Sequence, residues 1–136
     1  MDKTHRSHLR VARPVRNIDR AAAMYCQGLE LRVLADFRDH DGFDGVIIGS
    51  EGKDYHLEFT KNRRHPVAPR PTPEDLLVFY YPHESEWRLA CGKMEAAGFE
   101  AVTSLNPYWD VRGRTYQDCD GYRIVLQQER WNPETS

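Results

Sequence analysis

The chain has 136 residues, of which 40% are hydrophobic and 29% are charged, and these proportions are typical of one globular domain or of two small halves that share a core. A formal net charge of −2 argues against broad electrostatic capture of nucleic acid. Residues 1–6 lack the apolar run of a secretion signal, and no stretch approaches the ~20 apolar residues of a membrane span. The three cysteines form no CxxC pair. We therefore expect a cytoplasmic protein whose thiols are reduced.

The first half of the sequence predicts a β-α-β-β-β module. Residues 8–13 form a strand that ends at Pro14, and Asn17 then caps a helix. Gly28 fits a left-handed helix stop, and residues 29–37 and 46–48 predict two strands on either side of a turn at 39–45. The apolar positions of the helix form one stripe, which consists of Ile18, Ala21, Ala22, Tyr25 and Cys26.

Residues 55–60, with the sequence YHLEFT, alternate between apolar and polar side chains and predict a strand with one buried face. Leu57 and Phe59 lie on the predicted core face, whereas His56 and Glu58 lie on the opposite face. A carboxylate among large apolar neighbours is costly to desolvate unless it has a partner. We therefore expect Glu58 to hold a ligand, a metal ion or an arginine.

Residues 61–74 contain four prolines and no periodicity, and they predict an extended linker. Their basic residues have no interleaved aromatic side chains, which favours a solvated linker over a nucleic-acid patch. The pattern of the first half then returns. Strands are expected at 76–81, 99–103, 114–119 and 122–128, a helix at 84–97, an aromatic loop at 106–109, and a tight turn at Asp120-Gly121.

The two halves also match in detail, which indicates an internal repeat. The residues Gly28 to Glu30 correspond to Gly98 to Glu100, and positions 55–60 correspond to 122–127. The predicted fold class is α+β: two tandem βαβββ modules whose sheets curl around a ligand cleft, all within one domain of residues 1–136. Module 1 spans about 7–60, the linker 61–74, and module 2 about 75–129.

Over about residues 7–129 the chain resembles the vicinal oxygen chelate superfamily, which includes glyoxalase I, extradiol dioxygenases and the fosfomycin- and bleomycin-resistance proteins. The resemblance rests on the paired modules, on residues 23–25 followed by 28–30, on 56–60, and on 118–124. It implies the fold above, frequent pairing as a homodimer, and a divalent metal held by two ligands from each module. On the first strand the matching ligand is His8 or, with a shorter loop to the helix, Arg10; on the fourth strand it is Glu58.

Module 2 departs from the superfamily pattern. The carboxylate that the resemblance places opposite Glu58 falls at Val125, and the fifth-strand histidine falls at or near Leu77. Catalytic metals usually need about three protein ligands and an open position. We therefore expect no cofactor, or at most a weakly bound divalent metal on His8 and Glu58.

Two interpretations of Glu58 remain open. In one, Glu58 and His8 form a metal site that His56 or a dimer mate completes; in the other, which Val125 and Leu77 favour, Glu58 lines a polar wall and pairs with Arg10 or Arg123. Tyr108 and Trp109 either stack a planar ligand at the cleft mouth or pack in a core or dimer interface.

The functional prediction is a small-molecule-binding protein of the glyoxalase/bleomycin-resistance group without a conventional metal. Its partners are a small organic molecule and a second copy of the chain, with no role for nucleic acid or a membrane. One alternative is a lyase, isomerase or dioxygenase in which Glu58 is the base or a metal ligand, and the other is a drug-sequestering resistance protein. The candidate catalytic residue is Glu58, and the candidate binding residues are His8, Arg10, His56, Tyr108, Trp109, Arg123 and Gln127.

Overall fold

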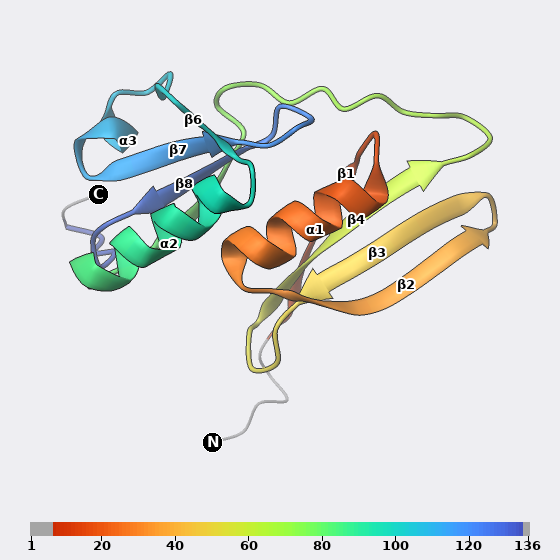
Figure 1. The fold of residues 1–136 in the computed structure, drawn as a ribbon, viewed down its shortest axis with the longest axis horizontal. Coiled ribbons are helices and arrows are strands. Elements are labelled where there is room, and N and C mark those ends of the chain that lie inside the picture. Colours follow the sequence, from red (N-terminus) through yellow and green to blue (C-terminus); the bar gives the residue numbers. More distant parts are fainter. Residues whose placement is uncertain (1–6, 135–136) are drawn as a thin grey trace. The chain divides into compact units, whose positions relative to one another are not determined.

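The structure is a computed structural model that describes residues 7–134, and the chain divides into two compact units (Figure 1). The first unit comprises the described residues up to Cys26 together with Glu30–Pro69. The second comprises Gln27–Leu29 and the described residues from Arg70 onward. No helix within residues 7–134 is long and apolar enough to cross a membrane.

The first unit contains one four-stranded sheet and one helix. Its strands follow the order β1-β4-β3-β2, with β1 parallel to β4 and the other pairs antiparallel. The elements in chain order are β1 (Leu9–Pro14), α1 (Ile18–Leu29), β2 (Arg32–His40), β3 (Phe43–Gly49) and β4 (Tyr55–Asn62).

The second unit repeats this arrangement in the strand order β5-β8-β7-β6, with β5 parallel to β8. The two sheets are separate, and the repeat confirms the predicted α+β fold of two βαβββ modules. The predicted aromatic loop contains the short helix α3. The elements are β5 (Leu76–Tyr80), α2 (Glu84–Ala96), β6 (Glu100–Val102), α3 (Tyr108–Val111), β7 (Gly113–Gln117) and β8 (Arg123–Gln127).

Helix α1 begins as predicted but ends at Leu29, one residue after Gly28, and its cap is Glu30. The Asn17 side chain accepts a hydrogen bond from the backbone N–H of Arg20, and the left-handed cap is Glu30, with a φ of 56°. The prediction that Gly28 adopts the left-handed conformation was wrong, because Gly28 lies inside the helix. A Cβ atom there would approach the Phe99 ring to 2.8 Å, so glycine is needed for space.

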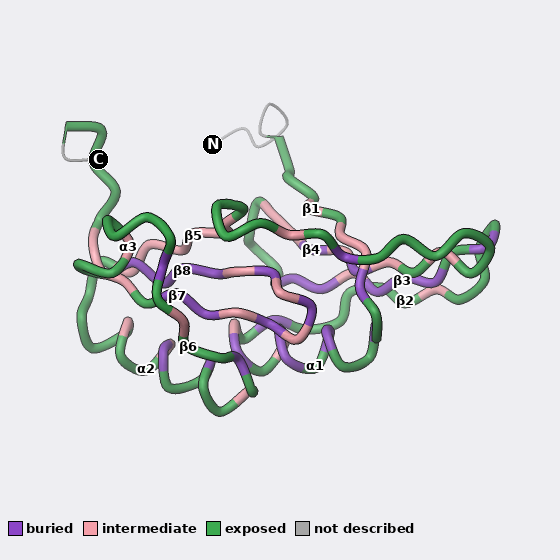
Figure 2. Tube along the Cα trace, turned by 90° about the horizontal axis from the view of Figure 1, so that it is seen from above, coloured by how far each residue is buried: buried purple, intermediate pink, exposed green. Residues whose placement is uncertain are grey.

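The core of the first unit lies between α1 and the sheet. The rings of Tyr25 on α1 and Phe59 on β4 pack with their centroids 4.8 Å apart, and both residues are buried. Figure 2 shows buried segments, in purple, along the helix α1. Ile48 and Leu57 are buried as well. The alternation in β4 therefore directs Leu57 and Phe59 inward, as predicted, and leaves Glu58 on the sheet face opposite the helix.

The core of the second unit lies between α2 and its sheet. Cys91 and Met94 of α2 are buried with Tyr116, Ile124 and Leu126 of the strands, all within 1% exposure. The indole Nε1 of Trp87 donates to the Leu126 carbonyl at 2.8 Å, and the hydroxyl of Tyr116 donates to Glu95 at 2.7 Å. These bonds tie α2 directly to β7 and β8.

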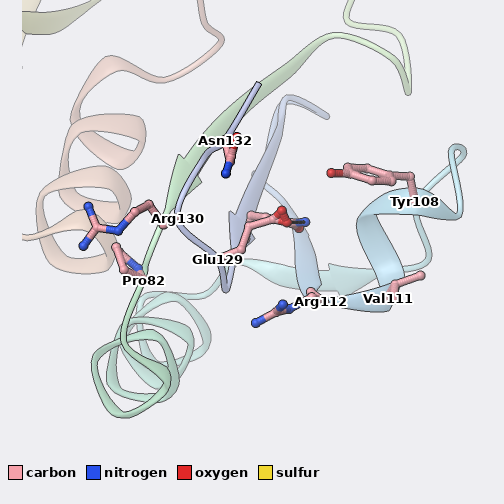
Figure 3. A pocket seen from close by; sticks show the side chains of 8 residues that line it. Pro82, Tyr108, Val111, Arg112, Glu129, Arg130 and Asn132 are labelled. Atoms are coloured by element: carbon pink, nitrogen blue, oxygen red, sulfur yellow. Dashed lines mark hydrogen bonds between the residues drawn. The ribbon is translucent and has the colours of Figure 1, made fainter. Parts of the chain in front are cut away.

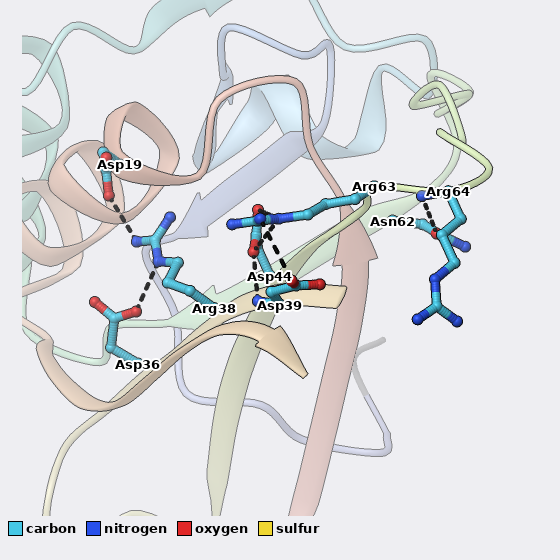
Figure 4. A network of polar contacts seen from close by, with 8 residues as sticks. All are labelled: Asp19, Asp36, Arg38, Asp39, Asp44, Asn62, Arg63 and Arg64. Carbon is cyan, nitrogen blue, oxygen red and sulfur yellow. Dashed lines mark hydrogen bonds and ion pairs between the residues drawn. The ribbon is translucent and has the colours of Figure 1, made fainter. Parts of the chain in front are cut away.

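The turn between β2 and β3 is tighter than predicted and is fixed by a carboxylate. Residues 39, 41 and 42 have positive φ, which reverses the chain within two residues. Asp44 accepts from the backbone N–H of Asp39 at 2.9 Å and from the Arg63 Nε at 2.9 and 3.0 Å (Figure 4). The start of the linker is thereby joined to the hairpin.

The Asp44–Arg63 pair gives an expected pH dependence. The hydrogen bond from Arg63, followed by that from Asp39, lowers the pKa of Asp44 below its ordinary 3.8. A carboxyl whose pKa is lower in the folded state stabilises the fold above its unfolded pKa, and this stabilisation is lost as the pH falls through the folded value. Arg63→Gln should therefore lower the urea midpoint at neutral pH, and the difference from wild type should shrink toward about pH 2.

The matched control is Lys53→Gln, which removes one positive charge from an exposed turn of the same unit. It should leave the urea midpoint and its pH dependence unchanged. A difference between wild type and Arg63→Gln that stays constant across the acid range would contradict this account of Asp44.

Candidate functional site

Four of the predicted site residues lie together in the first unit. The parallel register places Arg10 beside His56 and Ala12 beside Glu58. Because strand residues two apart share a face, Arg10, His56 and Glu58 all lie on the face opposite α1. His8 precedes β1, and its ring lies 4.5 Å from that of His56.

The side chains of this group form a short chain of hydrogen bonds. The Nε of Arg10 donates to Nε2 of His56 at 2.7 Å, and Nδ1 of His56 lies 2.6 Å from Nε2 of His8. An arginine is always a donor, so Nε2 of His56 must carry the lone pair and its proton must sit on Nδ1. His56 then donates to His8. We call this group, Arg10, His56, His8 and Glu58, the polar cluster.

The electrostatics of the polar cluster keep His56 neutral. Burial, the Arg10 guanidinium and His8 lower the pKa of His56, in that order of size, and Glu58 acts in the opposite direction. Protonating Nε2 would also place two donors face to face in the Arg10 contact. His56 is therefore held as a neutral imidazole with a fixed tautomer.

Glu58 pairs with Arg10. Its Oε2 atom lies 3.7 Å from Nη1 of Arg10, and its side chain is 13% exposed, against 48% for Arg10. Of the two partners that the sequence offered, the structure brings Arg10 to Glu58. The guanidinium thus neutralises a carboxylate that is largely removed from solvent, which is the requirement that the sequence pattern predicted.

The second unit has no carboxylate in the position that corresponds to Glu58. That residue is Val125, which is fully buried and pairs with Val78. Among residues 7–134, no group of three or more His, Cys, Asp or Glu side chains is arranged to hold a metal ion. Catalytic metal sites usually have about three protein ligands.

The fifth-strand position expected at or near Leu77 falls at Leu76. Leu77 pairs with Ile124 and lies on the α2 face of its sheet, whereas Leu76 pairs with Arg123 and takes the place equivalent to Arg10. Neighbouring residues of a strand point to opposite faces, so only one of the two leucines lies on the face equivalent to that of the polar cluster. Leu76 is also apolar, so the conclusion about metal ligands is unchanged.

The other predicted binding residues lie in the second unit. Tyr108 and Trp109 on α3 pack edge to face with their ring centroids 4.9 Å apart. Arg123 donates from Nε to the Gln117 side chain at 3.1 Å, on the neighbouring strand. Gln127 lies at the end of β8 and is 1% exposed.

Tyr108 and Gln127 line a pocket of about 470 Å³ in the second unit (Figure 3). Sequence reasoning missed the other lining residues, because the C-terminal segment that supplies three of them follows the last strand and has no periodicity. The additional lining residues are Pro82, Val111, Arg112, Glu129, Arg130 and Asn132.

Comparison with known families assigns both halves of the chain. Residues 9–60 match the YycE-like N-terminal domain, and residues 74–128 match the YycE-like C-terminal domain. The uncharacterized protein YycE of Bacillus subtilis is 40% identical over 124 residues, which cover 91% of this chain and 89% of that protein. The chain belongs to the YycE-like family.

Solved structures support the wider relationship of this YycE-like protein. A crystal structure of a YycE protein of unknown function from B. subtilis, a candidate glyoxalase/fosfomycin resistance protein, has a TM-score of 0.84 at 39% identity and covers 93% of both chains. The fosfomycin resistance protein FosX of Mesorhizobium loti shares the fold, with a TM-score of 0.70 at 11% identity over 97% of both chains. The resemblance to the vicinal oxygen chelate superfamily is confirmed.

The tautomer argument predicts how His56 titrates. Arg10→Met removes a positive charge and a donor at Nε2, so the pKa of His56 should rise. Two-dimensional NMR of the imidazole nitrogens across the titration measures both the pKa and the tautomer. In wild type the Nε2 resonance should have the shift of an unprotonated nitrogen at neutral pH.

Arg20→Met on the exposed face of α1 is the control, and it should leave the pKa and the tautomer of His56 unchanged. An unchanged His56 pKa in Arg10→Met, or a proton on Nε2 in wild type, would show that the polar cluster is connected differently.

Proposed function

We propose that this YycE-like protein binds a small organic molecule on the face of its first sheet that carries the polar cluster, without a resident divalent metal or other cofactor. The observation that carries the proposal is the position of Arg10, whose guanidinium contacts both Glu58 and His56. A fixed cation already neutralises the carboxylate that metal-dependent relatives would offer to an ion. The chemistry of this face is therefore hydrogen bonding and charge recognition.

Each member of the polar cluster has a role in this proposal. Arg10 is 48% exposed and keeps N–H groups for an oxygen atom of the ligand, because guanidinium carries five donors. Its contacts with His56 and Glu58 hold it in one orientation, so less rotamer entropy is lost when a ligand binds. His8 sits at the far end of the hydrogen-bonded chain and continues the polar surface beyond the strand.

A thermal-shift screen of small oxygenated organic molecules, run with and without EDTA, tests the proposal. At least one compound should raise the melting temperature equally in both conditions. Arg10→Gln and Glu58→Gln should then lower the affinity of the protein for that compound by about 10- to 100-fold, which is the usual effect of removing a charged hydrogen-bond partner.

The chain supplies a matched control pair on the same unit. Arg32 and Glu51 also form an ion pair, but both side chains are exposed and neither belongs to the polar cluster. Arg32→Gln and Glu51→Gln should leave affinity within about twofold of wild type. Binding that disappears with EDTA and returns on adding a divalent metal would refute the metal-free proposal.

A second candidate function, a lyase or isomerase of the same superfamily, is favoured by the contact between Glu58 and Arg10. A carboxylate that is 13% exposed beside a guanidinium can take a proton while the arginine stabilises developing negative charge on an oxygen. If the identified ligand is converted, Glu58→Gln should abolish turnover and leave binding measurable. Unchanged turnover in Glu58→Gln would remove this candidate.

A further inference from the structure

The pocket in the second unit has a surplus of hydrogen-bond acceptors. Figure 3 shows the Tyr108 hydroxyl directed across the pocket toward Glu129, with Asn132 beside them. The carboxylate of Glu129 receives a bond from Nε2 of Gln127 at 3.3 Å, which is long for a contact with a charged group. A carboxylate with such a weak donor retains most of its capacity to accept hydrogen bonds.

Gln127 adds an acceptor that nothing satisfies. Its side chain is 1% exposed, and its Oε1 atom has no hydrogen-bond partner within the described part of the chain. The Oε1 atom is enclosed and packs against Gly113, where a Cβ atom would collide with it. The part of the Gln127 side chain that reaches the pocket carboxylate is Nε2, through its bond to Glu129.

Two tyrosines stand near the Glu129 carboxylate. Tyr108 lines the pocket, and Tyr80 lies on β5 in register with Gln127. Burial raises the pKa of Tyr80, and the charges of Tyr108 and Glu129 raise it further. Aromatic rings beside a carboxylate are the surroundings that organic cations prefer.

Two arginines also line the pocket, and both keep their positive charge. Arg112 donates from Nη2 to the side chain of Gln128 at 3.1 Å, and in Figure 3 the guanidinium of Arg130 extends away from the space between Glu129 and Tyr108. An anionic ligand would have to draw these groups inward and lie against the Glu129 carboxylate. Pro82 and Val111 supply apolar surface for the body of a ligand.

From these contacts we propose that the pocket binds an organic amine, with its ammonium on Glu129 and its flat apolar body against Tyr108. The volume of about 470 Å³ is that of a small-ligand site. The donor hydrogens of the ammonium pair with the oxygen atoms of the Glu129 carboxylate, whose bond from Nε2 of Gln127 is 3.3 Å long. This site lies wholly within the second unit and does not depend on the polar cluster of the first.

A pair of probes that differ in charge tests the proposal. 2-Phenylethylamine and 3-phenylpropionate share a phenyl ring and a similar chain, and each is titrated into ¹⁵N-labelled full-length protein by NMR. The amine should bind at least about tenfold more tightly than the acid, and it should shift the side-chain NH₂ signals of Gln127. Glu129→Gln should remove the preference for the amine.

Glu100→Gln, on the exposed strand β6 of the same unit, is the matched control and should keep the preference. Far-ultraviolet circular dichroism of both variants verifies that they are folded. The proposal is overturned if the acid binds as well as the amine, if neither probe binds, or if Glu129→Gln retains the discrimination. Because Arg10→Gln leaves this pocket intact, amine binding should persist in that variant whether or not the proposed function is correct.

Discussion

The contact of Arg10 with His56 and Glu58 is the interaction on which the chemistry of the first unit depends. It exists because β1 and β4 pair in parallel, which sets Arg10 beside His56 and one pleat away from Glu58. The guanidinium fixes the tautomer of one neighbour and neutralises the charge of the other. A cation built into the protein therefore lies beside a carboxylate that is largely removed from solvent.

The internal repeat shows how one framework carries two kinds of surface. Both units place an edge strand parallel to their last strand and cover one sheet face with a helix. In the first unit the opposite face is charged and partly accessible, whereas in the second the equivalent of Glu58 is the buried Val125. The polar groups of the second unit lie instead at the end of β8 and in the segment after it, where the pocket forms.

Much of this arrangement follows from local patterns in the sequence. The alternation in residues 55–60 placed Glu58 and Phe59 on opposite faces, and Asn17 was recognised as a cap because its side chain suits the start of a helix. The repeat gave the topology. The sequence predicted Arg10 or Arg123 as the partner of Glu58, because strand parity puts Arg10 and Glu58 on one face, and the structure contains the contact with Arg10.

Other features depend on tertiary contacts that no local pattern encodes. Glycine is a common residue at helix ends, so Gly28 was expected to end the helix. Instead Phe99 and Met94 leave no space for a larger side chain at Gly28, and Glu30 adopts the left-handed conformation. The sequence could not tell which of Leu76 and Leu77 takes the place equivalent to Arg10, because both residues are leucine. Glu129 joins the pocket only because the chain folds back after its last strand, and no periodicity marks that segment.

Elemental analysis of the protein purified without chelators tests the central claim most directly. The account predicts that zinc, nickel, manganese and iron together fall well below one equivalent per chain, and that adding any of them leaves the His56 tautomer unchanged. One equivalent of a divalent metal, whose removal changes the His56 tautomer, would contradict it.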